Sequence, residues 1–133
     1  MVTWREAVLK ELREGYAEKG QVVDMVLLHE RDVTQMLQLA MPTVKMQKAA
    51  LFAAQKIVAA NRGHIEDAVL IATVARGDGD KAVMVLFETK KGVTPLMFKP
   101  DGKTLTEIHA GKMVPFVGLG LWLNEPDTGG MYR

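Results

Sequence analysis

Two long apolar runs constrain the fold of this chain more than any other feature of its sequence. Residues 69–74 and 82–87 are apolar at nearly every position. The connector between them, residues 76–81, is rich in Gly and Asp, which tolerate positive φ and favour a β-hairpin. Because neighbouring residues of a strand point to opposite faces, strands that do not alternate with polar residues require burial on both faces.

The hairpin can be buried on both faces in two ways. Either helices of the same chain cover both faces of the sheet, or helices cover one face and another protein surface covers the other. The second alternative would make the chain part of an oligomer or a complex, because large apolar patches on proteins mark interaction sites. The sequence leaves both alternatives open.

A helix is predicted near the amino terminus. Thr3 and Glu6 have the spacing of a capping box, and Gly20 is a typical helix stop. The apolar residues between them recur every four positions, which predicts a helix with one buried stripe: Trp4, Val8, Leu12 and Tyr16.

The next segment, residues 21–41, fits two interpretations. Residues 22–28 alone could form a buried strand, whereas the apolar positions of the whole segment follow a 3.6-residue period. We predict a helix that restarts at Asp32, whose spacing to Gln35 resembles a capping box, and ends before Pro42. Whether residues 21–30 are helix or strand stays open.

A further helix is predicted from Thr43, as its N-cap, to about Ala60. Its polar residues form a narrow stripe, so the wide apolar remainder predicts a mostly buried helix. The chain also contains nine methionines. Several are expected to fill the core, although their flexible side chains would equally suit an adaptable contact surface: Met25, Met36, Met46 and Met84.

Three more strands are predicted after the hairpin, at residues 93–99, 104–108 and 113–123. Pro95 and Pro115 lack a backbone donor, which places their segments at edges, bulges or strand starts.

The predicted fold class is α+β, with two or three N-terminal helices packed on a four- or five-stranded antiparallel sheet. The length is that of a single domain, residues 1–133. We expect residues 1–62 to be helical, residues 67–123 to form the sheet, and residues 124–133 to be an irregular tail.

Composition excludes several classes of function. The chain has no cysteine and no serine, so thiol and serine nucleophiles, disulfides and thiolate metal sites are impossible. The formal net charge is +1, with no basic stripe, which makes nucleic acid an unlikely partner. No apolar run reaches the length of a membrane span and no secretory signal is visible, so we expect a cytoplasmic protein without membrane contact.

Few residues suggest chemistry. His29, His64 and His109 are weak acid–base candidates, and Glu66 accompanies His64 at a predicted helix-to-strand turn. None of the histidines has a neighbour at a local metal-binding spacing, so no metal site is predicted. No phosphate-binding or dinucleotide motif is present, so no cofactor is expected.

A second group of residues suggests contact with a protein. Four lysines surround two predicted turns and could form a basic rim that contacts an acidic partner or a phosphate backbone: Lys90, Lys91, Lys99 and Lys103. Trp122 is an additional candidate contact residue.

Two classes of function follow from these features. The first is a non-catalytic interaction or assembly protein, such as an accessory, inhibitor or structural subunit, whose partner is another protein or a second copy. The alternative is a small-molecule-binding or enzyme domain with a pocket between helix and sheet that uses histidines and carboxylates.

Overall fold

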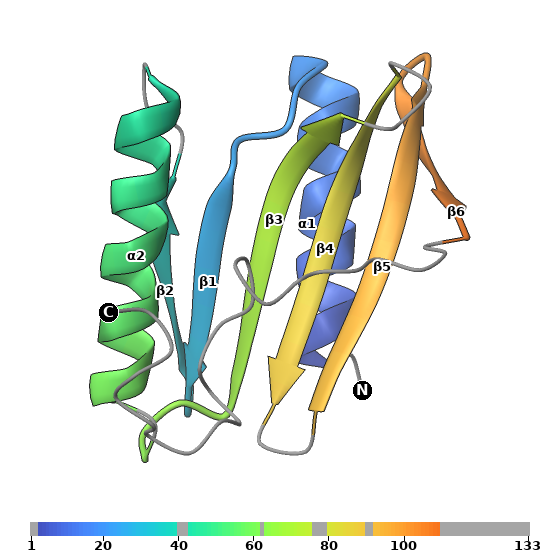
Figure 1. Cartoon of the computed structure of the whole chain (residues 1–133). Helices are drawn as coiled ribbons and strands as arrows, with labels where there is room; N and C mark the ends of the chain where they lie inside the picture. The colour runs from blue at the N-terminus through green and yellow to red at the C-terminus, as the bar shows by residue number, and fades with distance from the viewer. Residues whose placement is uncertain (1–2, 40–42, 62, 76–79, 90–91, 110–133) are drawn as a thin grey trace.

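A computed structural model describes residues 3–39, 43–61, 63–75, 80–89 and 92–109 (Figure 1). The described part contains two helices and a six-stranded sheet in the order β2-β1-β3-β4-β5-β6, and all neighbouring strands are antiparallel. The elements are α1 (Trp4–Lys19), β1 (Met25–Glu30), β2 (Val33–Gln38), α2 (Val44–Ala60), β3 (Asp67–Ala75), β4 (Lys81–Thr89), β5 (Gly92–Asp101) and β6 (Thr104–Ile108). The predicted α+β class is confirmed, but the predicted four or five strands are too few.

Both predicted helix starts are confirmed by their caps. The Thr3 hydroxyl accepts a hydrogen bond from the Glu6 backbone N–H at 3.2 Å, and the Thr43 hydroxyl accepts one from the Met46 N–H at 3.1 Å. Helix α1 also ends as predicted, because Gly20 adopts the left-handed conformation, with φ of 71°.

The helix predicted between α1 and α2 is wrong, and so is the expectation that residues 1–62 are helical. This segment forms the β1–β2 hairpin, in which Asp32 belongs to a two-residue turn and caps no helix. The run of valines and leucines satisfies a period of 2 as well as 3.6, and β-branched residues favour the strand. The turn carries no glycine: Arg31 adopts φ of 50°, a conformation that costs an L-residue roughly 1–2 kcal/mol.

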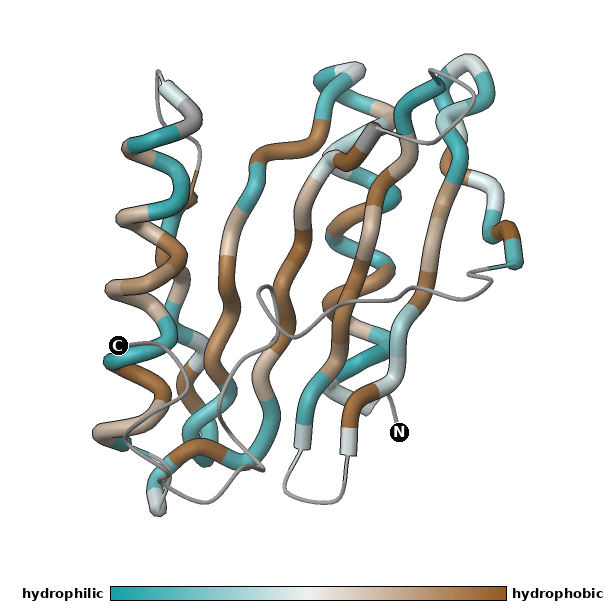
Figure 2. Tube along the Cα trace, in the orientation of Figure 1, coloured by the Kyte–Doolittle hydropathy of each residue, from teal (hydrophilic) through white to brown (hydrophobic). Residues whose placement is uncertain are grey.

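The central strands are buried on both faces, and the two helices lie on opposite sides of the sheet, with α1 behind β3 and β4 and α2 beside β1 and β2 in the view of Figure 1. Figure 2 shows the apolar residues concentrated along β3 and β4. On the α2 side, Ala54 and Val58 pack with one set of alternating strand residues: Val26, Leu28, Ala68, Leu70, Met84 and Leu86. On the α1 side, Val8 and Leu12 pack with the other set: Val69, Ile71, Val83, Val85, Phe87 and Phe98. Both faces of the β3–β4 hairpin are therefore buried within a single chain, as in the first alternative, although α2 lies on the β1–β2 side of the sheet.

Helix α2 is less buried than its sequence predicts. It contacts the sheet through a stripe that includes Ala54 and Val58, and its outer side leaves Met46, Phe52 and Ile57 exposed. The wide apolar arc of the helix therefore does not correspond to a wide buried surface.

Pro95 lies at a local edge, as predicted. Strand β6 pairs with β5 only from Met97 to Asp101, so at Pro95 the described part of β5 has a partner on one side only, where Leu86 of β4 lies opposite. The predicted strand at residues 113–123, Pro115 and the tail at 124–133 lie outside the described residues.

Candidate functional site

Strand β2 forms one edge of the sheet and is its most exposed strand. Among the described residues it pairs with β1 alone. Five of its six residues are exposed. Two of them are large and apolar, Val33 at 58% and Met36 at 62% exposure. An exposed edge strand is a template for pairing with another strand.

The backbone groups that β2 presents outward can be assigned from the register. The Leu39 N–H donates to the Asp24 carbonyl at 2.9 Å, so pair 24/39 belongs to the hydrogen-bonded set of the β1–β2 ladder. Because hydrogen-bonded and non-bonded pairs alternate, Val33, Gln35 and Leu37 also bond to β1. The backbone groups of the other three strand residues therefore face outward: Thr34, Met36 and Gln38.

A groove of about 490 Å³ runs along the same edge, between α1 and the β1–β2 hairpin. Most of its lining is apolar, with the exposed carboxylate of Glu11 as its one charged side chain. Its lining includes Trp4, Ala7, Met25, Leu27 and Met36. The exposed apolar surface of β2 therefore continues into a concave apolar surface beside it.

Trp4 fixes the position of α1 over this hairpin. Its indole N–H donates to the Thr34 hydroxyl at 3.0 Å, and its ring stacks on His29 with centroids 5.0 Å apart and planes inclined by 6°. His29 Nδ1 in turn lies 3.4 Å from Asp67 Oδ2 and 3.6 Å from Glu66 Oε2. The His29 ring is thus held between the aromatic face of Trp4 and two carboxylates.

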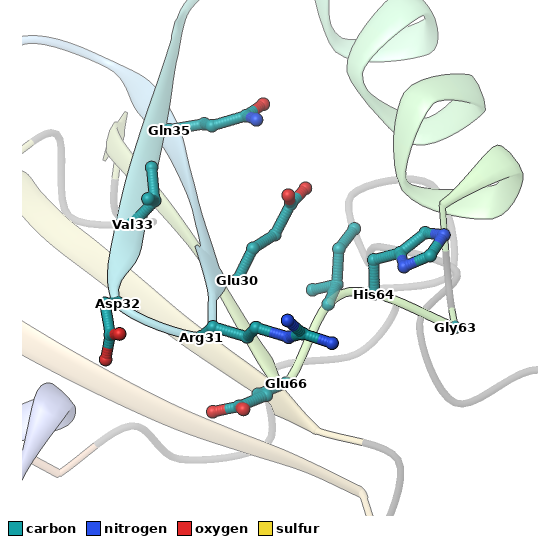
Figure 3. Close-up of a pocket in the computed structure, with 9 residues that line it drawn as sticks. Glu30, Arg31, Asp32, Val33, Gln35, Gly63, His64 and Glu66 are labelled. Carbon is teal, nitrogen blue, oxygen red and sulfur yellow. The ribbon is translucent and has the colours of Figure 1, made fainter.

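A second cavity, of about 720 Å³, lies at the turn of the β1–β2 hairpin (Figure 3). Its lining includes Glu30, Arg31 and Asp32 from the hairpin, and His64 and Glu66 from the segment after α2. Figure 3 shows Arg31 extending from the turn toward that segment, whereas Asp32 points away from Glu30. Among the described residues no carboxylate lies within 4.0 Å of a His64 nitrogen, and no group of three potential metal ligands is found.

The structure therefore brings together three of the four acid–base candidates. His64 and Glu66 line the turn cavity, and His29 approaches Glu66 from β1. His109 follows β6 at the other edge of the sheet and is exposed.

The predicted lysine rim is only partly visible. Lys99 and Lys103 are exposed, in β5 and in the turn before β6. They lie toward the end of β5 that is remote from Gly92. Lys90, Lys91 and Trp122 lie outside the described residues.

Two residues of the exposed edge, Val33 and Thr34, were missed because the sequence was assigned to a helix there, and Met36 was named only among methionines that could fill the core or form a contact surface. One signal could have identified them. Residues 33–44 contain no charged side chain, whereas an exposed helix of that length would normally carry several.

Comparisons with models of known protein families, with curated proteins and with solved structures find no match to this chain. In the part of the chain that the structure describes, neither helix has the length and apolar character needed to cross a membrane.

Proposed function

We propose that this chain is a non-catalytic interaction or assembly protein that binds its partner by adding a β-strand to the β2 edge. The observation that carries the proposal is the uncharged edge strand β2, which pairs with β1 alone in the described part of the chain and has Met36 at its centre. An added strand gains main-chain hydrogen bonds from Thr34, Met36 and Gln38. Its side chains would gain apolar contacts with Val33, Met36 and the adjoining groove.

The other edge of the same sheet supports this proposal by contrast. Natural proteins protect edge strands by making them short or by adding charges, prolines or bulges. Strand β6 has five residues, carries Glu107 and is preceded by Lys103. Strand β2 has no charge and no proline, so within the described residues its own sequence carries none of the protection that β6 carries.

The acid–base alternative has weaker support. Its candidate site is the cavity at the hairpin turn, which His64 and Glu66 line. General acid–base catalysis needs groups that converge on a common point within hydrogen-bonding reach. His64 has no such carboxylate partner among the described side chains, and His29 is occupied by its contacts with Trp4 and Asp67.

Replacement of Met36 by lysine tests the proposal. The side chain is largely exposed, so the substitution leaves the fold intact but places a charge at the centre of the edge. Light scattering and gel analysis of the purified proteins should show wild-type chain in a complex, with itself or with a co-purifying protein. We expect Met36→Lys to lose that complex.

Val93→Lys is the matched control, because it adds the same charge at an exposed valine of β5. It should retain the complex, and circular dichroism should show that both variants are folded. A wild-type chain that is monomeric at every concentration and carries no other protein would contradict the proposal.

A further inference from the structure

We infer that the strand added to β2 is the β2 strand of a second copy of this chain, paired antiparallel about a two-fold axis between the two Met36 residues. This inference rests on the proposed function and names its partner. It would join two six-stranded sheets into one continuous sheet.

Hydrogen bonding favours this register. With Met36 opposite its own copy, Thr34 of each chain lies opposite Gln38 of the other. All three are the residues whose backbone groups face outward, so each of the three pairs is a hydrogen-bonded pair and about six bonds form between the chains. A shift of one strand by a single residue would place Met36 opposite Leu37, whose backbone groups already bond to β1. Outward-facing groups would then lie opposite inward-facing ones, and the hydrogen bonds between the chains would be lost.

Charge also favours a second copy. A strand that pairs with itself places each of its charges near the same charge of its copy, which destabilises the pair. Residues Val33–Gln38 carry no charge, so β2 meets no such repulsion. The charged turn residues, Glu30 to Asp32, would lie at the two opposite ends of the paired strands, well away from their counterparts.

Side-chain contacts complete the argument. The Met36 side chains of the two copies lie side by side on the α1 face of the sheet, next to both grooves. On the α2 face, the exposed Val33 lies opposite Leu39 of the other copy. Methionine suits such a contact because its flexible thioether adapts to its neighbour. Pairing therefore covers the exposed Met36 with its equivalent, whereas Val33 meets Leu39, which is already buried in its own chain.

The complex is expected to be weak. Pairing of two short strands buries less than the roughly 1,600 Å² of a standard protein interface. We therefore expect a dissociation constant in the range of about 1–100 μM, and measurements should extend to several hundred micromolar.

Disulfide trapping tests both the partner and the register. The natural sequence contains no cysteine, so Met36→Cys introduces a single thiol. In a hydrogen-bonded antiparallel pair the two Cα atoms are about 5.5 Å apart, within the range of about 4.4–6.8 Å that a disulfide requires. We expect Met36→Cys to form a covalent dimer under mild oxidation, visible on a non-reducing gel.

Thr34→Cys is the matched control on the same face of the same strand. In the inferred register, Thr34 is offset from its own copy by four residues, or about 13 Å, which a disulfide cannot span. Met36→Cys should therefore cross-link at least tenfold faster than Thr34→Cys. Mixing Thr34→Cys with a Gln38→Cys variant should restore cross-linking between the two chains.

Equal rates for Met36→Cys and Thr34→Cys would overturn the inference. A second outcome would overturn the inference but leave the proposed function intact. In that outcome the wild-type chain does not bind a second copy of itself but co-purifies with a different protein, and the Met36→Lys variant no longer binds that protein. A monomer without any partner would overturn both.

Discussion

Replacing Phe87 with alanine should lower the free energy of unfolding by about 3–5 kcal/mol. Phe87 is 1% exposed and lies on the α1 face of β4, where it packs in the cluster that includes Val8 and Leu12. Its ring also contacts Trp4 edge-on, with centroids 6.3 Å apart, and lies 5.1 Å below the Arg5 guanidinium carbon. The loss combines a cavity in the core with two lost ring contacts.

Denaturant unfolding followed by circular dichroism measures this loss. Phe87→Leu is the informative companion, because it keeps most of the apolar volume but removes the ring contacts, and it should lose clearly less. If Phe87→Ala unfolded with wild-type free energy, the α1 face of β4 would not be part of the core.

Replacing the neighbouring residue Leu86 with alanine should cost about 2–5 kcal/mol. Leu86 is also 1% exposed, but it points to the α2 face and packs in the other cluster. In a sheet covered on one face only, one of two adjacent residues would be exposed, and its replacement would change the free energy of unfolding very little. Large losses at both positions are therefore expected only if both faces are buried.

The same unfolding experiment also tests whether the faces of β4 are buried by the same chain or by a second protein. Because Leu86 and Phe87 are both buried within a single chain, the losses at these positions should not depend on protein concentration. Val93→Ala, at an exposed position of β5, serves as the control and should change stability by less than about 0.5 kcal/mol. A small loss at Leu86, comparable to that control, would contradict burial of the α2 face.

The parts of the fold that the sequence predicted are those with a local physical signal. The β3–β4 hairpin follows from two apolar runs around a Gly- and Asp-rich connector, and both helix starts follow from threonine caps. In each case the residues that determine the local structure are close together in the chain. Contacts with distant parts of the chain therefore do not change the structure that these residues favour.

The β1–β2 hairpin could not be predicted in the same way. Its turn uses Arg31 in a left-handed conformation, at a position where glycine or asparagine would have signalled a turn. Its strand residues also match a helical period. The pairing of β1 with β3, more than thirty residues later in the chain, is a non-local contact that decides between the two periods.

The candidate site was missed for the same reason. In a helix, Val33 and Met36 would face one buried stripe, whereas in an edge strand they are exposed on its two faces. The buried fraction of α2 could not be predicted from the sequence either. Periodicity shows which residues of a helix are apolar, but it does not show which of them contact the sheet.

The proposed contact surface lies at an edge of the sheet rather than on its faces. Both faces of β3 and β4 are buried within the chain, so among the described residues these two strands leave no large apolar face for a partner. The β2 edge keeps its outward backbone groups and its exposed apolar side chains. The central claim is that these outward groups of β2 are bonded in the assembled protein and free in the monomer.

Amide hydrogen exchange at two protein concentrations tests that claim most directly. At high concentration, the N–H groups of Thr34, Met36 and Gln38 should exchange at least tenfold more slowly than in dilute solution. The N–H groups of Gln35 and Leu37, which bond to β1, should change much less. Equally fast exchange of Thr34, Met36 and Gln38 at both concentrations would contradict pairing at the β2 edge.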